Sequence, residues 1–296
     1  MNVELVDFLA TDGVLNNGYL VNSGSKKIVI ATHGMSSNCF KEREKTISTK
    51  LNENGIDFFV YNSRGSELVK YVKKIDSQGN ETKCLGGTSY EDPKEGYYDI
   101  LGAIKEMVNR GYEEIYLQGH SLGSTKVLYT YNKLKEENSD YLKFVKGIIL
   151  LSLVDIPRVL KIYLKERYDE VVSLAKDMKE SGRELELMKP GSFIHPISVK
   201  SFLCYSIDSE EIDFARYSDN EYNFDKLNNI DVPLFMRWGN NNEMIEQSAD
   251  ELISSLNSKV NNKFKNINYI DGADHGYTKK EDILAKEIVD FLKNMV

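Results

Sequence analysis

The sequence predicts an α/β protein: a mostly parallel central sheet flanked by helices. Two observations carry this prediction. Short apolar runs alternate with longer amphipathic segments along the chain, and several of the apolar runs end in turns. The length agrees, because 296 residues suffice for one large domain or for a core domain with a substantial insertion.

The N-terminal part begins with an expected antiparallel hairpin. Its strands are residues 3–10 and 14–21, separated by the turn sequence Thr-Asp-Gly. Residues 27–34 and 57–62 are short apolar runs typical of buried parallel strands. A helix over residues 41–53 is expected to connect them.

The middle of the chain continues the alternation of strands and helices. A helix is expected over residues 89–111, where apolar residues recur at helical spacing and a glycine closes the segment. A strand then leads into a turn at 119–123 and a helix over 121–135. Residues 145–154 are the most apolar run of the chain and are expected to form a central strand. The C-terminal part supplies two more strands, each followed by a helix: 232–239, 246–259, 264–271 and 281–295.

One interval breaks the alternation. Residues 155–229 contain helix-like segments but no convincing core strand. Five residues of this interval form an apolar stripe at helical spacing: Leu160, Leu164, Tyr168, Val171 and Ala175. The pattern predicts a helical lid, residues 155–229, inserted between the sixth and seventh strands of a core domain made of residues 1–154 and 230–296.

Composition excludes several classes of function. Lys and Arg number 38 against 46 Asp and Glu, a net charge of −8, and no basic cluster is interleaved with aromatic residues, which argues against nucleic-acid binding. No apolar run is long enough to span a bilayer, and the N-terminus carries acids where a signal peptide needs positive charge, so a cytoplasmic location is expected. Three widely spaced cysteines and four histidines predict neither a disulfide framework nor a metal site.

The segment Gly119-His120-Ser121-Leu122-Gly123 fits the G-x-S-x-G pattern of a nucleophile elbow. Strand-like residues precede it and helix-like residues follow it, as the strained strand-to-helix turn requires. Glycines on either side let neighbouring backbone pass without Cβ clashes, so that the serine Oγ projects above the sheet near a helix N-terminus. The alternative, a glycine-rich turn with a solvent-facing serine, explains less of this context.

Together with three other segments, this elbow resembles the α/β-hydrolase family of serine esterases and lipases. The segments are HGMSSN after the third strand, YNSRGS after the fourth and GADHGY after the last, so the resemblance covers nearly the whole chain. The order nucleophile, acid, histidine is the one that this family uses. The resemblance implies the α/β-hydrolase fold and a serine carboxylesterase or acyl hydrolase that needs no cofactor.

The resemblance also implies an oxyanion hole and a general base. The backbone N–H groups of Met35 and Leu122 correspond to the family's oxyanion donors, which can supply about 3–4 kcal/mol. His275 is the candidate base, since it follows the last strand and stands among small residues; a surface histidine is the alternative. The other three histidines are expected to have structural roles: His33, His120 and His195.

The sequence offers more than one candidate for the catalytic acid. In the family an aspartate commonly stands three residues after the glycine that ends the seventh strand, and counting from Gly239 gives Asn242. An amide does not stabilise an imidazolium, and the corresponding change in serine proteases lowers turnover about 10⁴-fold. Glu243, the next residue, is therefore the preferred acid. Its alternative role is that of a solvated residue at the start of the following helix. Asp155 is the alternative acid, although it also suits a helix N-cap before Pro157, and a third possibility is that no functional acid exists.

The leading hypothesis is a serine hydrolase that cleaves a carboxylic ester, or a related thioester or lactone, through an acyl-enzyme on Ser121. Its partner is expected to be a small, partly apolar ester, because the insertion is rich in Leu, Ile, Phe and Tyr. The alternative is a non-catalytic hydrolase-fold protein that binds a small ligand, which the asparagine run 240–242 favours. A carboxylate nucleophile, as in epoxide or haloalkane hydrolases, is a weaker alternative because a serine occupies the elbow.

Overall fold

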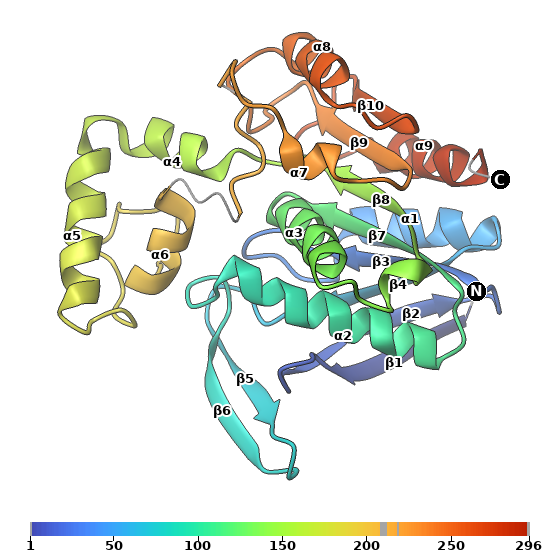
Figure 1. The fold of residues 1–296 in the computed structure, drawn as a ribbon, viewed down its shortest axis with the longest axis horizontal. Coiled ribbons are helices and arrows are strands. Elements are labelled where there is room, and N and C mark those ends of the chain that lie inside the picture. Colours follow the sequence, from blue (N-terminus) through green and yellow to red (C-terminus); the bar gives the residue numbers. More distant parts are fainter. Residues whose placement is uncertain (1, 208–211, 218, 295–296) are drawn as a thin grey trace.

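A computed structural model describes residues 2–207, 212–217 and 219–294 of the chain (Figure 1). Within these residues, eight strands form one sheet in the order β1-β2-β4-β3-β7-β8-β9-β10. The strands of this sheet are β1 (Asn2–Leu9), β2 (Leu15–Asn22), β3 (Lys27–Thr32), β4 (Asp57–Asn62), β7 (Glu114–His120), β8 (Val145–Leu151), β9 (Leu234–Gly239) and β10 (Lys265–Ile270).

The sheet is parallel except at one edge. β1 and β2 pair as the predicted antiparallel hairpin, and β2 is antiparallel to β4, whereas all later pairs are parallel. The predicted mostly parallel sheet is therefore confirmed. Because parallel strands end at the same edge of a sheet, the loops that follow β3, β7, β8, β9 and β10 meet there.

Helices cover both faces of the sheet (Figure 1). α1 (Glu42–Glu53) and α9 (Glu281–Lys293) pack against one face, around a core that contains Ile47, Leu51, Leu284 and Ile288. α2 (Gly96–Asn109), α3 (Leu122–Glu136) and α8 (Ala249–Lys259) pack against the other face, around Ile100, Ile104, Leu128 and Leu256. Full burial of each such side chain contributes about 1.5–3 kcal/mol, so these apolar stripes hold the three layers together.

The predicted helix over residues 89–111 is shorter than expected. The 3₁₀ turn η1 (Pro93–Glu95) precedes α2, and the Asp92 carboxylate caps this turn by accepting the Lys94 N–H at 3.0 Å. Gly111 follows the helix with φ +92°, a conformation that glycine adopts readily.

Between β8 and β9 the described residues add no strand to the large sheet. They form α4 (Ile156–Leu164), the 3₁₀ turn η3 (Lys165–Arg167), α5 (Tyr168–Glu180), α6 (Val199–Ser206) and α7 (Asp225–Asn228). The predicted apolar stripe spans two helices, because the α-helix breaks at Lys165, whose φ is +52°. α4, α5 and α6 share a third hydrophobic cluster that also includes Leu122 of the core.

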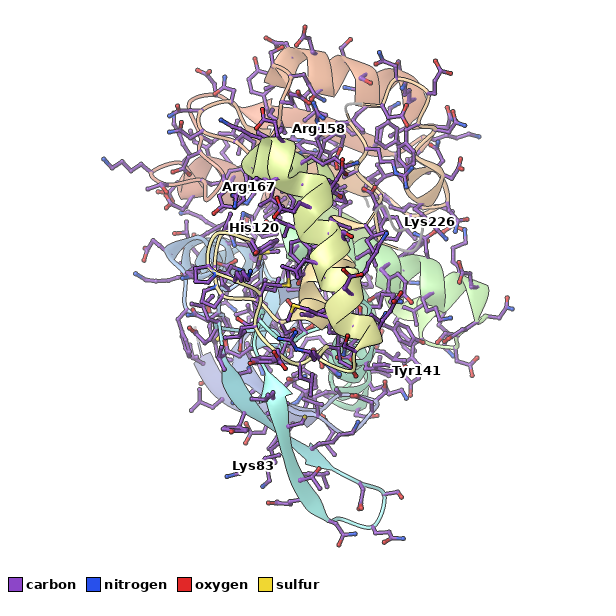
Figure 2. All side chains as sticks on the ribbon, turned by 90° about the vertical axis from the view of Figure 1, so that its left-hand side faces the viewer. Lys83, His120, Tyr141, Arg158, Arg167 and Lys226 are labelled. Carbon is purple, nitrogen blue, oxygen red and sulfur yellow. The ribbon has the colours of Figure 1, made fainter. Side chains whose placement is uncertain are left out.

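A two-stranded hairpin was not predicted. It consists of β5 (Lys70–Ile75) and β6 (Glu81–Gly86), and it projects from the body of the molecule, with Lys83 on its outer part (Figure 2). Most of its side chains are at least partly exposed, and Val72 is the buried apolar residue of the pair. The charged strand sequences therefore carry no apolar face from which a sequence pattern could be read.

No helix among the described residues combines the length and the hydropathy needed to cross a bilayer.

Candidate active site

Ser121 lies in a strained turn between β7 and α3. Its φ and ψ are 54° and −125°, a region that non-glycine residues rarely occupy, and its N–H donates to the Leu151 carbonyl at 2.8 Å. Both flanking positions need glycine, because a Cβ atom there would clash with neighbouring backbone. A Cβ on Gly119 would lie 2.3 Å from the Gly123 carbonyl oxygen, and one on Gly123 would lie 2.2 Å from the Thr32 oxygen. This is the geometry of a nucleophile elbow.

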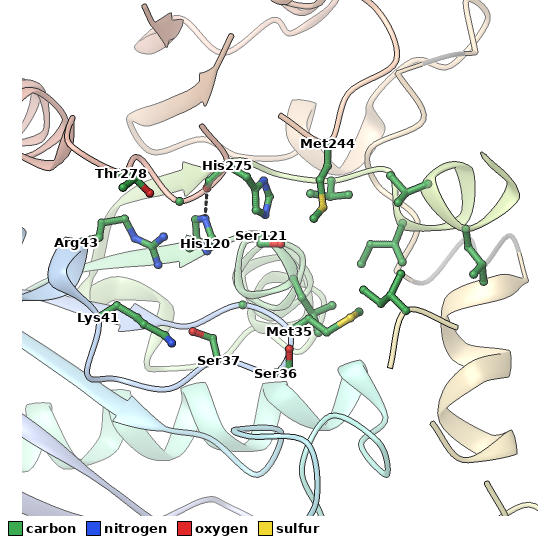
Figure 3. A pocket seen from close by; sticks show the side chains of 18 of the residues that line it. Met35, Ser36, Ser37, Lys41, Arg43, His120, Ser121, Met244, His275 and Thr278 are labelled. Carbon is green, nitrogen blue, oxygen red and sulfur yellow. Dashed lines mark hydrogen bonds between the residues drawn. The ribbon is translucent and has the colours of Figure 1, made fainter. Parts of the chain in front are cut away.

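His275 lies in the loop between β10 and α9 and is bound to a carboxylate. Its Nδ1 forms a hydrogen bond with Glu243 Oε1. The side chain of Glu243 is only 2% exposed, and its Oε2 accepts from Ser152 Oγ at 2.7 Å and from the Gly239 N–H at 3.0 Å. With Nδ1 turned to the carboxylate, Nε2 is the nitrogen left for proton transfer. Figure 3 shows the imidazole ring beside Ser121.

The surroundings of Glu243 keep its carboxylate ionised. Burial by itself raises the pKa of this carboxyl group, but the hydrogen bonds from His275, Ser152 and Gly239 outweigh burial and hold the pKa below its ordinary value. Ser152 Oγ also lies 3.0 Å from the hydroxyl of Tyr277. A buried anion that is bonded on both oxygens is well suited to stabilise an adjacent imidazolium.

The other two acid candidates have different surroundings. Asn242 is exposed, and its backbone φ is +52°, a left-handed conformation that asparagine tolerates. Asp155 is the N-cap of α4, where its carboxylate accepts the Arg158 N–H at 3.1 Å. Of the three candidates, the structure brings Glu243 to the histidine.

Met35 lies in the loop after β3, and Leu122 directly follows Ser121 at the start of α3. Leu122 is the first residue of α3, so its N–H has no acceptor within the helix. The loop that carries Met35 passes directly over the elbow, because a Cβ on Gly34 would lie 3.0 Å from the Ser121 Cβ. Both residues line the same cavity as Ser121.

His33 and His195 make local structural contacts. His33 Nδ1 is 2.8 Å from the Gly34 oxygen, and its Nε2 accepts the Ser63 N–H at 3.2 Å, which leaves neither nitrogen for proton transfer. Burial lowers the pKa of His33 to about 3. His195 Nδ1 is 2.9 Å from the Pro196 oxygen, and burial lowers its pKa as well.

His120 and Ser152 have site contacts that the sequence did not reveal. His120 Nε2 lies 2.7 Å from the backbone oxygen of His275 and holds the histidine loop against the elbow (Figure 3). Burial lowers the pKa of His120 well below its ordinary value, so its ring is neutral and donates this bond. Ser152 directly follows the most apolar strand, and this position is the one sequence signal from which it could have been found.

A cavity of about 520 Å³ opens above Ser121. Its apolar lining residues include Leu122, Val154, Ile156, Leu160, Phe193 and Met244. Its polar lining residues include Ser36, Ser37, Lys41, Arg43 and Thr278. Figure 3 shows Ser37, Lys41, Arg43 and Thr278 on the opposite side of Ser121 from Met35 and Met244. Across the described part of the chain, no group of three or more His, Cys, Asp or Glu side chains is arranged to hold a metal ion.

Comparison of the sequence with protein-family models and with curated proteins finds no match. Solved structures are similar over nearly the whole chain. Est1E from Butyrivibrio proteoclasticus, with ferulic acid bound, has a TM-score of 0.63 and 15% identity, over 97% of this chain and 98% of that one. The Pyrococcus furiosus esterase Pf2001 has a TM-score of 0.62 and 17% identity, over 100% and 93%.

A soluble variant of the monoglyceride lipase from Saccharomyces cerevisiae, in complex with a substrate analogue, has a TM-score of 0.63. It is 16% identical, over 100% of this chain and 97% of that one. At such identities the similarity concerns the fold, and the chemistry has to be argued from the site itself.

Proposed function

We propose that this chain, an α/β-hydrolase by its fold, is a serine hydrolase that cleaves a carboxylic ester, or a related thioester or lactone, through an acyl-enzyme on Ser121. One observation carries the proposal: the buried Glu243 carboxylate binds His275 Nδ1 while His275 and the strained Ser121 line one cavity. Nucleophile, base and acid then occupy the roles of a catalytic triad.

In the first half of the proposed reaction, Ser121 Oγ attacks the carbonyl carbon of the ester and its proton passes to His275 Nε2. The carbonyl π electrons move to the oxygen, and the N–H groups of Met35 and Leu122 stabilise this oxyanion. Glu243 stabilises the imidazolium. The tetrahedral intermediate collapses, the bond to the leaving oxygen breaks, and that oxygen takes the proton from His275 as the alcohol departs.

In the second half, water attacks the carbonyl carbon of the acyl-enzyme and gives a proton to His275. The second tetrahedral intermediate expels Ser121 Oγ, which recovers its proton from His275 while the carboxylic acid is released. Atoms and charges balance with water as the only co-reactant, so the reaction as written needs no cofactor.

The same proposal divides the chain into a core domain, residues 1–154 and 230–296, and a lid, residues 155–229. Its support is that α4 and the loop at 193–194 line the apolar side of the cavity. An ester with an apolar chain would remove this surface from water on binding, worth about 25 cal/mol for each Å² buried. Part of the segment, 208–211 and 218, lies outside the described residues.

A fluorophosphonate probe tests the proposed nucleophile. We expect rapid labelling of the native chain at Ser121, together with turnover of acyl esters and thioesters of graded length. Ser121→Ala should abolish both labelling and turnover and leave the circular dichroism spectrum unchanged, since the serine side chain contributes nothing to packing that alanine lacks. A native chain that is folded but neither labelled nor active would instead support the hydrolase-fold binding protein.

A further inference from the structure

The cavity above Ser121 has a polar end that the proposed ester cleavage leaves without a role. Lys41, Arg43 and Ser37 lie on one side of the serine, while Met35 and Met244 lie on the other side (Figure 3). A substrate that fills the cavity therefore meets two different surfaces, with the scissile bond between them.

Arg43 presents a buried donor to this end of the cavity. Its side chain is 6% exposed, and its Nε and Nη2 both donate to Glu44 Oε1, at 3.1 and 2.5 Å. Among the residues that the structure describes, Arg43 Nη1 has no acceptor. Nη1 is therefore left to donate to an acceptor on a bound ligand.

The other groups at this end are also mostly donors. Lys41 is the N-cap of α1, and its ammonium has no ion-pair partner among the described residues; the hydroxyl of Ser37 likewise has no acceptor there. α1 and α9 both begin beside the cavity, at Glu42 and Glu281, and neither helix has a side-chain cap. Their first N–H groups and the positive ends of their dipoles favour an anion.

Two carboxylates belong to the same wall. Glu42 is bound to Lys45 at 3.2 Å, so its charge is already paired. Glu281 is the first residue of α9 and opposes the binding of an anion near it. The wall thus carries two cations and two carboxylates, and a preference for an anion comes from Lys41, Arg43 Nη1 and the two helix N-termini.

We propose that the polar end binds a carboxylate of the substrate, held by Arg43 Nη1 and Lys41 Nζ. The substrate is then an ester with an apolar chain on one side of the scissile bond and a carboxylate on the other side. This inference rests on the proposed serine hydrolase function and specifies its substrate class.

Pairs of esters that differ only in charge test the inference. The octanoyl esters of 3-hydroxybenzoate and 3-hydroxybenzamide place the charge on the leaving group, and the monohexyl esters of succinate and succinamate place it on the acyl group. In one of the two pairs we expect the carboxylate to be preferred in kcat/KM by about tenfold or more, the size of one charge-assisted hydrogen bond.

Variants separate recognition of the carboxylate from general damage to the site. Lys41→Gln should lower the preference several-fold, mainly through a KM that rises more for the charged ester than for its neutral partner. Glu281→Gln should raise the preference, because it removes a like charge. The matched control is Lys50→Gln, also on α1 but outside the cavity and paired with Glu53, which should leave both rates unchanged.

Arg43 needs a paired change, because removal of the arginine alone leaves the Glu44 charge buried and unpaired. Arg43→Gln combined with Glu44→Gln should remove most of the preference in a folded protein. Equal rates on both members of both pairs, or a loss in Lys41→Gln that is equal for charged and neutral esters, would overturn the inference and leave the serine hydrolase intact. Absence of Ser121-dependent turnover of all four esters would refute the proposed function and this inference with it.

Discussion

The carboxylate of Glu243 is bonded on both oxygens within a loop that turns sharply. Asn242 takes φ +52° immediately before it, and the Asn241 N–H donates to the Ala273 oxygen at 2.9 Å, which ties this loop to the one that carries His275. A side chain one residue later than the usual aspartate, and one methylene longer, thereby meets the imidazole. In the proposed triad the acid therefore lies one residue later than in the family pattern and still contacts His275.

Three substitutions distinguish the acid candidates. Glu243→Gln should lower kcat by orders of magnitude, up to about 10⁴-fold, because a neutral amide neither stabilises the imidazolium nor selects the productive tautomer. Asn242→Ala and Asp155→Asn should each change kcat only slightly. The measurement is steady-state hydrolysis of one ester by all three variants at equal folded concentration. If Asp155→Asn loses most of its kcat while Glu243→Gln keeps the native value, the acid has been assigned to the wrong residue.

Helix α4 links the cavity to the loop that carries Glu243. Residues on one side of this helix line the apolar wall, and Arg158 donates two hydrogen bonds to Glu246, at 2.7 and 2.6 Å. Both partners of this ion pair are more than a third exposed, so screening by solvent leaves it little weight in stability. The apolar contacts of α4 with the rest of its cluster hold the helix in place.

The length of acyl chain that fits the cavity should depend on α4. Val159→Trp adds bulk inside the apolar wall, so kcat/KM for octanoyl esters should fall about tenfold or more relative to acetyl esters, the cost of about 1–3 kcal/mol for overpacking. Ile162→Trp is the matched control, since Ile162 lies on the same helix, is 47% exposed and is absent from the cavity wall. The same drop for both chain lengths would mean that α4 does not bound the acyl site.

Burial of neutral histidines in the core links stability of the whole molecule to pH. Burial lowers the pKa of His33 to about 3 and that of His120 well below its ordinary value. In the unfolded chain a histidine titrates near 6.5, so below that pH the unfolded state binds more protons than the folded state. The folded protein therefore loses stability as the pH falls from about 6.5 towards 3.

Urea denaturation at pH 7.5 and pH 5.0 measures this effect. From His33 alone the free energy of unfolding should fall by about 2 kcal/mol between the two pH values. His33→Asn retains a donor near the position of Nδ1 and removes the titrating ring, so its loss over the same interval should be smaller by about that amount. Equal losses in the two proteins would show that His33 is protonated in the folded state or absent from the linkage.

Local sequence patterns were enough to predict much of the α/β framework. The order of strands and helices in the core followed from apolar runs and their turns, and the elbow at Ser121 followed from glycines whose Cβ atoms would meet backbone. The β5–β6 hairpin escaped prediction because its strands bury almost nothing, so no periodicity marks them. Hydrophobic periodicity in a sequence arises from burial on one face, and an exposed hairpin has no such face.

The amino-acid sequence by itself determined the α/β framework, the elbow and the loop of His275, because each depends on neighbours within a few residues. Only the tertiary structure decided which acid meets His275, that His120 holds its loop, and that Arg43 lines the same cavity as Ser121. Those contacts join segments far apart along the chain, which meet because parallel neighbouring strands bring their carboxyl ends to one edge of the sheet.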